Sequence, residues 1–425
     1  MWRHRDFALL WAGQSVSELG SQVSVLAIPL VAIDLLHATA FGVGVLTSME
    51  TLPFLLVGLP AGAWVDRLRR RPVLIAADVC RAVVLATIPL SWALSILTLT
   101  QLYVVSLFSG ILTVFFDVAY QSYLPALVGA ERLVEGNGKL AATQAGARVT
   151  GPAIGGALVG ALGAPAAVLA DAVSFVASFA SLLGIRAHEP RPVRGAGVGG
   201  HPSRLRSEIA EGLRFVWHEP RIRSVAGSTG TSNFFTTMGL AVSLLFLRRQ
   251  IHLSAGHIGV LLAAGGVGGL LGALAAARMA RSLGVGRTIL LTIVVSSLGE
   301  LGYPLSTRST VDVLVVVGGL LTSAGGVAYN INQVSLRQAL CPLRLQGRMN
   351  ASVRFMIWGT MPLGGFVGGV LGDTIGLRWT LWVAAAGSLS AFLWILLSPV
   401  PSVREIPDQV RELSPAMSGE GDVRI

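Results

Sequence analysis

Residues 41–66 read FGVGVLTSMETLPFLLVGLPAGAWVD, and residues 67–71, directly after them, read RLRRR. The first stretch carries only two charged residues, Glu50 and Asp66. As a helix it is long enough to cross the roughly 30 Å hydrocarbon layer of a bilayer. The second stretch places four arginines at one end of that helix, and arginines gather on the cytoplasmic side of membrane proteins. The two stretches predict a transmembrane helix that ends at the cytoplasm near residue 66.

The composition extends this prediction to the whole chain. Hydrophobic residues make up 53% of the 425 residues and charged residues 13%, whereas soluble proteins carry about 25% charged residues. The net charge of +10 is spread in short bursts between apolar runs, which is typical of membrane proteins and argues against a nucleic-acid partner. Two cysteines exclude a disulfide scaffold and a cysteine-based zinc site. We expect no metal and no cofactor.

Apolar segments that can cross a bilayer recur along the chain, and they predict an all-α membrane protein with twelve transmembrane helices. They cover residues 6–35, 41–66, 72–94, 99–127, 137–162, 165–185, 222–248, 256–280, 286–306, 311–340, 350–372 and 376–398. The predicted parts are an N-terminal six-helix bundle at 1–185, a cytoplasmic linker at 186–221, a C-terminal six-helix bundle at 222–400 and a disordered cytoplasmic tail at 401–425. In the linker, residues 203–218 have helical apolar spacing, which predicts an amphipathic helix on the membrane surface.

The basic residues orient the helices. With both termini in the cytoplasm, most of the 32 basic residues fall in cytoplasmic segments. The arginines that fall outside are Arg248, Arg249, Arg308 and Arg378. The positive-inside rule therefore predicts a multi-pass protein of the cytoplasmic membrane with an even number of spans. The apolar run that begins at Asp6 lacks a cleavage site, so we expect it to be retained as the first span.

An internal repeat relates the two halves. Pro152 and Gly155 recur as Pro362 and Gly365, Gly44 recurs as Gly259, and Asn137 recurs as Asn350, all at a nearly constant offset. Repeated halves joined by a linker are typical of transporters that hold a substrate between the halves.

The sequence resembles the major facilitator superfamily up to residue 399. Its most specific motif is GAWVDRLRRR at 62–71, which is similar to the superfamily loop motif G-x-x-x-D-R-x-G-R-R, with Arg69 in place of the second glycine. The resemblance implies a cytoplasmic gate formed by Gly62, Asp66, Arg67, Arg70 and Arg71. A carboxylate at this position can bind the positive N-terminus of a helix in the other half. The alternative is that the arginines only determine topology.

A second motif, GPAIGG at 151–156, is similar to the antiporter motif of this superfamily. The motif residues are Gly151, Pro152, Gly155 and Gly156. Proline removes a backbone hydrogen bond, and glycine allows a bend or a close helix crossing. Ordinary packing of small residues remains an alternative, because glycine-rich helices occur throughout the chain.

Short sequence segments favour one branch of the superfamily. WAGQ at 11–14, SELG at 17–20 and DAVSFVAS at 171–178 resemble macrolide-efflux and enterobactin-exporter proteins. The resemblance implies export of an amphipathic drug, natural product or siderophore. One feature departs from the drug–proton antiporters, since the fourth span has no arginine in an R-x-x-Q-G context. Coupling to protons then requires another acid.

Charged residues inside the predicted spans are candidates for proton or substrate sites, because such residues cost about 2.5–3.5 kcal/mol in a bilayer. Glu18 and Glu50 are the preferred candidates for this role. A structural charge network is the favoured interpretation of Asp117, Arg148 and Asp171, and Asp78 with Arg81 is expected to be a structural pair. The remaining candidates, each with a structural alternative, are Glu300, Arg354 and Asn233.

Other functions fit less well. An ATP-driven pump needs a Walker lysine, and the only lysine, Lys139, lacks that context. No clustered nucleophile, base or metal set indicates an enzyme. We therefore expect a monomeric secondary transporter whose partners are the lipid bilayer, a small-molecule substrate and protons. Import of a nutrient by a proton symporter, or a membrane sensor that does not transport, would share most of these features.

Overall fold

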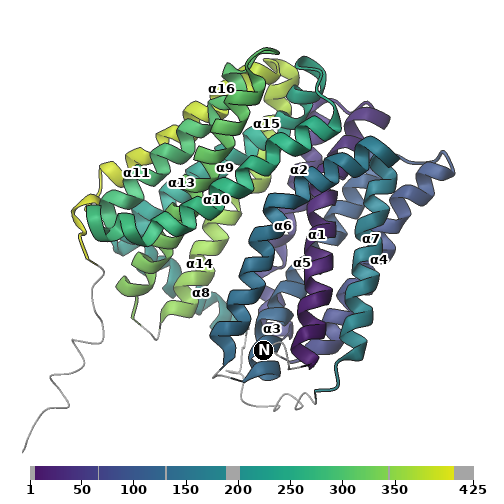
Figure 1. The fold of residues 1–425 in the computed structure, drawn as a ribbon. Helices are drawn as coiled ribbons and strands as arrows, with labels where there is room; N and C mark the ends of the chain where they lie inside the picture. Colours follow the sequence, from purple (N-terminus) through teal and green to yellow (C-terminus); the bar gives the residue numbers. More distant parts are fainter. Residues whose placement is uncertain (1–4, 66, 130–131, 188–201, 343–344, 406–425) are drawn as a thin grey trace, which may run out of the picture.

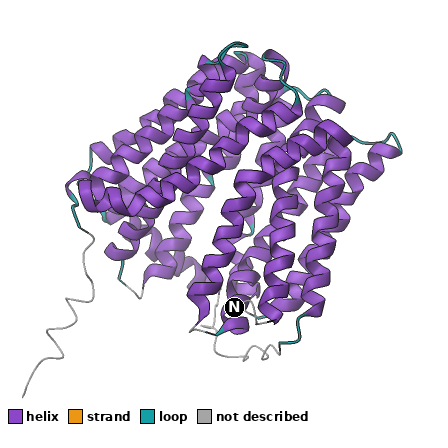
Figure 2. Cartoon of the chain, viewed as in Figure 1, coloured by secondary structure: helices purple, strands orange, loops and turns teal. Residues whose placement is uncertain are grey.

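The computed structural model describes residues 5–65, 67–129, 132–187, 202–342 and 345–405. Within these ranges every regular element is helical (Figure 2). The first half contains α1 (Arg5–Leu30), η1 (Val31–Leu35), α2 (Ala40–Leu56), α3 (Gly58–Val65), α4 (Arg70–Ala93), α5 (Leu99–Val128), α6 (Leu133–Leu162) and α7 (Ala164–Gly184). The second half contains α9 (Pro220–Leu245), η3 (Phe246–Gln250), α10 (Ala255–Leu283), α11 (Val285–Glu300), α12 (Gly302–Leu305), α13 (Val311–Leu340), α14 (Gln346–Trp358), α15 (Thr360–Thr374), α16 (Leu377–Ser390), α17 (Phe392–Leu396) and η5 (Val400–Ser402). The helix α8 (Pro202–His218) joins them.

Ten helices in the described residues are long and apolar enough to cross a membrane, and α2 is a shorter apolar helix. The protein is therefore an all-helical, multi-pass membrane protein. The predicted total of twelve spans also requires α6 and the broken helix α2–α3 to cross. The amphipathic helix predicted at 203–218 corresponds to α8.

Prolines and π-helical turns explain where long helices break. Pro53 lies near the end of α2, and the chain resumes as α3 after Val57. Pro362 follows the break between α14 and α15, as expected for a residue that cannot donate a backbone hydrogen bond. The π-helical turns η1 and η3 end the first helix of each half. The internal repeat is thus visible in a rare backbone feature.

The helices form two groups that meet along two seams (Figure 1). In the first group α1 packs against α6 and α7, and α4 packs against α5 and α7. In the second group α13 packs against α10 and α11, and α9 packs against α15 and α16. The seams between the groups are α2 against α15 and α6 against α10.

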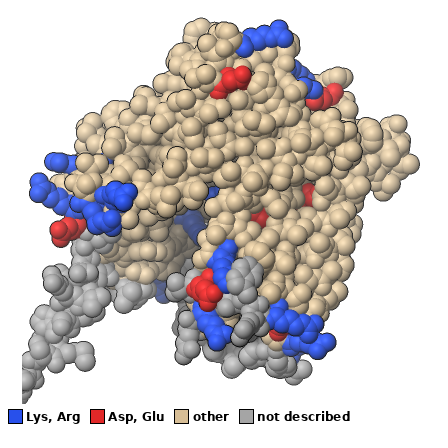
Figure 3. All heavy atoms as spheres, viewed as in Figure 1, with Lys and Arg blue, Asp and Glu red and all other residues tan. Residues whose placement is uncertain are grey.

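The groups diverge away from the seams. At the upper end in Figure 1, where η1, η3 and the start of α2 lie, the two groups are in contact; we call this the closed end. Toward the opposite end they separate, and Figure 3 shows a hollow between them with basic side chains inside. We call that the open end.

The start of the predicted C-terminal tail is ordered. Val400 is fully buried, and the amides of Val285 and Gly286 donate to the carbonyls of Arg404 and Val403. These contacts join η5 and the following residues to the start of α11. The predicted disorder therefore does not hold for Val403 and Arg404, and residues 406–425 lie outside the described residues.

Candidate functional site between the two helix groups

The seams depend on glycine at the positions of the internal repeat. A side chain on Gly259 would lie 2.3 Å from the carbonyl oxygen of Pro152, and one on Gly44 would lie 2.6 Å from that of Gly365. Real side chains do not tolerate these distances, so the helices are in backbone contact at both places. The hydroxyl of Ser48 strengthens the second crossing by donating to the carbonyl oxygen of Pro362 at 2.7 Å. Pseudo-equivalent residues thus form equivalent crossings.

The antiporter-like motif lies where α6 is held between α1 and α10. Gly151 faces Gln22 and Gly155 faces Val23, both on α1, while Gly156 faces Gly259 on α10. The packing interpretation of this motif agrees with these contacts. The motif residues contact helices of both groups. A change in the angle between the groups must therefore alter the packing around the motif.

Polar contacts join the groups at the closed end. Arg249 of η3 donates to the carbonyl oxygen of Ile33 in η1 at 3.2 Å, and two further contacts involve a carboxylate. Arg248 of η3 donates to both carboxylate oxygens of Asp34 in η1, at 2.9 and 3.1 Å. The carboxylate of Asp373, at the end of α15, accepts from the backbone amides of Ala40 and Phe41 at 2.9 and 3.0 Å. These amides form the positive N-terminus of α2, which favours a carboxylate. We call these contacts the latch; sequence reasoning named Arg248 but missed both acids.

Four of the predicted charged residues come together beside the hollow. Glu18 of α1 is partly exposed, whereas Asp117 of α5, Arg148 of α6 and Arg354 of α14 are exposed. Glu18 interacts electrostatically with Arg148, and its side chain hydrogen-bonds with that of Gln22. Asp117 interacts with Glu18 and, across the space between the groups, with Arg354. This central cluster offers both acidic and basic groups to a molecule between the halves.

Asp171 lies in a buried network around Arg81. This network is continuous with the central cluster, because Arg81 also interacts electrostatically with Asp117 and Glu18, and Asp171 interacts with Glu18. Arg81 donates to Asp78 at 2.5 Å and interacts electrostatically with Asp171. Its guanidinium carbon lies 4.4 Å from the centre of the Phe116 ring and 4.1 Å from that of Phe175. The predicted Asp78–Arg81 pair is therefore confirmed, and the aromatic rings hold its charge in place.

Glu50 and Asn233 lie apart from these groups. Glu50 is exposed and stands one helical turn before Phe54, whose ring meets that of Trp358 with centroids 4.6 Å apart. Arg354 lies over the same Trp358 ring at 5.6 Å. Asn233 of α9 donates to the carbonyl oxygen of Ile357 at 3.3 Å, a contact between helices of the same half that fits its structural alternative.

Among the predicted charged residues, Glu300 has surroundings that differ most from those of the central cluster. It closes α11 and lies inside the second half, where Thr236 and Ser388 donate to its Oε1 at 2.6 and 3.1 Å. A cavity of about 210 Å³ adjoins it. Its surroundings contain hydroxyl groups and apolar side chains, unlike the ionic central cluster.

The loop motif at 62–71 lies at the open end. Asp66 is outside the described residues, so the structure does not place the acid of the predicted gate. Arg67 is exposed, Arg70 begins α4, and Gly62 has no close neighbour beyond its own helix. Arg71 donates to the carbonyl oxygens of Leu182 and Leu183, each at 3.0 Å.

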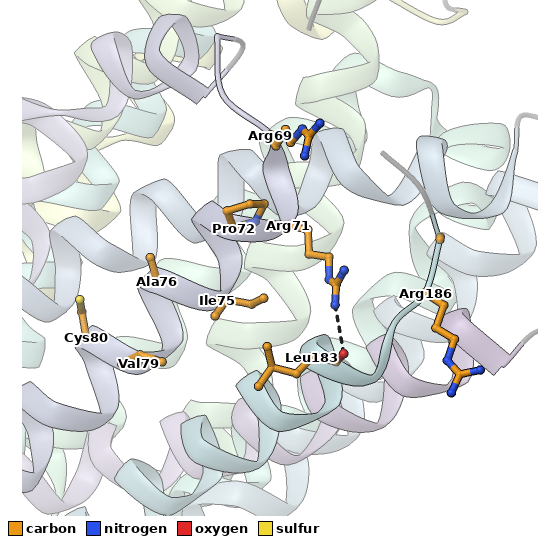
Figure 4. Close-up of a pocket in the computed structure, with 10 residues that line it drawn as sticks. Arg69, Arg71, Pro72, Ile75, Ala76, Val79, Cys80, Leu183 and Arg186 are labelled. Carbon is orange, nitrogen blue, oxygen red and sulfur yellow. Dashed lines mark hydrogen bonds between the residues drawn. The ribbon is translucent and has the colours of Figure 1, made fainter. Parts of the chain in front are cut away.

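A surface pocket of about 740 Å³ adjoins Arg71 (Figure 4). Arg69 and Arg186 also line it, but their side chains point away from Arg71. The three guanidinium groups therefore do not converge on one point. Arg71 instead caps the end of α7, where the last carbonyls of a helix favour a cation.

The linker helix is fixed to the second half near the open end. Arg348 of α14 forms an ion pair with Glu211 of α8, and Gly212 allows the two helices to approach closely. Val216 of α8 is buried against Met349 and Val353. Part of its apolar face thus contacts protein.

The family model described as transmembrane secretion effector matches residues 2–417. The multidrug efflux pump Tap of Mycolicibacterium fortuitum is 27% identical over 94% of this chain and 95% of its own length. The enterobactin exporter EntS of Escherichia coli O1:K1 / APEC is 27% identical over 96% of this chain and 95% of its own.

One solved relative has been captured in two states. A bacterial homologue of the iron transporter ferroportin in its inward-facing state matches 94% of this chain and 99% of its own, at 18% identity and a TM-score of 0.72. In its outward-facing state it matches 92% and 98%, at 18% identity and a TM-score of 0.60. At this identity the likeness concerns the fold.

Proposed function

Because the chain belongs to the transmembrane secretion effector family of the major facilitator superfamily, and is a transporter rather than an enzyme, we propose that it exports an amphipathic small molecule. A drug, a macrolide-like natural product or a siderophore is the expected substrate. The relatives support export, since two of them are a multidrug efflux pump and an enterobactin exporter. Import of a nutrient by proton symport is the second candidate.

The observation that carries this proposal is the central cluster beside a space that is open at one end only. Asp117 and Arg354 belong to different helix groups and interact across that space. The seams and the latch join the groups at the other end. Transporters of this kind hold their substrate between two halves that rock about it.

We assign the open end to the cytoplasm. The arginines of residues 67–71 lie there, and arginines favour the cytoplasmic side. The better match to an inward-facing fold than to its outward-facing form supports the same assignment. In this arrangement the chain has twelve spans in two six-helix bundles, both termini are cytoplasmic, and a monomer in the cytoplasmic membrane alternates between the two openings.

Protons are the proposed coupling ion, and Glu18 is the proposed carrier. Its carboxylate is partly exposed beside the hollow and faces Arg148. A neighbouring cation and a change in hydration alter the proton affinity of a carboxylate in opposite directions. Rocking of the two groups would change the hydration of the hollow and the distance of Arg354 from the cluster, which links proton binding to the state of the transporter.

Proteoliposomes containing the purified protein test this function. An imposed pH gradient should drive a fluorescent amphipathic drug in the direction opposite to the proton flow. Glu18→Gln should abolish pH-driven transport and retain drug binding, whereas Asp312→Asn, at an exposed residue of the closed end, should retain both. Drug movement in the same direction as protons would establish the symporter instead, and normal coupling in Glu18→Gln would exclude Glu18.

The gate at Asp66 remains a separate prediction. Asp66→Asn should increase the labelling of cysteines introduced on the cytoplasmic side of the hollow, because the predicted gate depends on this carboxylate binding a helix N-terminus of the other half. An unchanged labelling pattern would leave Arg67, Arg70 and Arg71 with a topological role only.

A further inference from the structure

The cavity beside Glu300 lies within the second half and is separate from the central cluster. Helices α9, α10, α11, α13 and α16 all contribute to its wall. Its volume of about 210 Å³ exceeds what one water molecule needs, so the carboxylate borders a space and is not packed on all sides.

The carboxylate has no cationic partner within the described residues. Its contacts are the hydroxyls of Thr236 and Ser388, and both bind the same oxygen, Oε1. In the part of the chain that the structure describes, no ion pair involves Glu300, and the hydroxyl of Tyr303 lies near it. A lone carboxylate inside a membrane protein is costly unless something neutralises it.

The wall of the cavity indicates which cation would fit. It is mostly hydrocarbon, with Leu240, Leu261, Leu262, Val315 and Leu381 contributing branched side chains. Mg²⁺ and Ca²⁺ require several oxygen ligands, and the described residues contain no group of three or more His, Cys, Asp or Glu side chains that could hold a metal. An apolar wall with one negative charge instead complements an apolar molecule with one positive charge.

We propose that this cavity binds the ammonium group of a small lipophilic amine, with Glu300 as its counter-charge. Thr236 and Ser388 hold Oε1, which leaves Oε2 to accept a hydrogen bond from the ammonium group. The leucines and Val315 then surround the apolar part of the molecule. Within the proposed function, lipophilic amines are then one class of substrate, and this role in transport rests on that function. Binding itself can be measured without transport.

Calorimetry on the purified full-length protein in detergent tests the site. The probe is N,N-dimethylbenzylammonium, and its neutral analogue is N,N-dimethylbenzamide. The wild type should bind the ammonium ion at least about tenfold more tightly than the amide, which corresponds to about 1.4 kcal/mol. Glu300→Gln should lose that preference, and Glu300→Asp, which keeps the charge, should retain part of it.

Asp312→Asn serves as the control and should bind as the wild type does. Equal affinity of the ammonium ion for wild type and Glu300→Gln, or no binding to the wild type, would overturn the site. Thermal unfolding of each variant shows that it is folded before binding is measured. If Glu300 governs binding but liposomes show no transport, the binding site is supported and the transport function is refuted. If transport is normal and Glu300→Gln binds the ammonium ion unaltered, the transport function is supported and the binding site is refuted.

Discussion

In the first half, Arg81 lies beside Asp78 and between the rings of Phe116 and Phe175, whereas in the second half Glu300 meets hydroxyl groups and a cavity. The two halves share a repeat, two equivalent seams and two π-helical turns. They differ in whether a buried charge has a partner of opposite charge among the described residues. A paired charge that is packed on all sides holds helices together, and a lone charge beside a space is available to a ligand or a proton.

The largest expected effect on stability follows from removing Arg81, the cationic partner of Asp78. Arg81→Met leaves Asp78 and Asp171 buried without a cation, and breaking a buried pair costs about 3–5 kcal/mol. We expect the protein to be strongly destabilised or not to accumulate in the membrane. Thermal unfolding in detergent measures this, with Arg69→Met at an exposed position as the matched control. A midpoint equal to that of the wild type would show that the pair is not structural.

The seams should respond alike in both halves, which tests how far the repeat extends. Gly259→Ala and Gly44→Ala each place a methyl group against backbone atoms of the opposite helix. Overpacking of this kind costs about 1–3 kcal/mol. Gly138→Ala is the control, since nothing lies within 4 Å of the added carbon. If only one of the two seam variants lowers the unfolding midpoint, the crossings are not equivalent.

Breaking the latch should lower the stability less than the seam variants do, and it should measurably change how often the closed end opens. Asp373→Asn weakens the cap on the N-terminus of α2, a change worth about 1 kcal/mol. We expect the closed end to open more often, because this contact exists only when the two groups meet there. Labelling of Ala38→Cys, a buried position at that end, measures the change in a background without Cys80 and Cys341. Unchanged labelling would mean that the seams alone hold the closed end.

The sequence predicted the helices well because hydrophobic length and arginine position are local properties. Residues 165–185 and 311–340, for example, match α7 and α13 closely. It also predicted the Asp78–Arg81 pair, since residues three apart share one face of a helix. Contacts between distant segments were harder to predict from the sequence. The Asp34–Arg248 pair depends on η1 and η3 lying side by side, and nothing near Asp373 in the chain indicates that it caps α2.

The candidate site shows the same division. Glu18, Asp117, Arg148 and Arg354 were recognisable as charges within apolar segments. Their meeting beside the hollow depends on how the groups are placed, which no single segment specifies. Asp171 was grouped with Asp117 and Arg148. In the structure Asp117 and Asp171 both interact electrostatically with Arg81, and Gly20 lets α1 approach the part of α7 that carries Asp171 and Ser174.

The smallest expected change in stability belongs to Glu300. Glu300→Gln removes a buried charge that has no cationic partner among the described residues and keeps an oxygen that accepts from Thr236 and Ser388. Replacing such a charge by a neutral group of the same shape is often neutral or stabilising. We therefore expect an unfolding midpoint equal to or slightly above that of the wild type.

Asp171→Asn is the matched variant of the first half. It removes a carboxylate that interacts electrostatically with Arg81, so it should lower the midpoint. A clear loss of stability in Glu300→Gln would mean that its carboxylate has a structural partner after all, and the contrast between the two halves would then disappear. If Glu300→Gln is tolerated while Asp171→Asn is not, the lone carboxylate is maintained at no benefit to the fold, and a ligand or proton is the remaining reason for its presence.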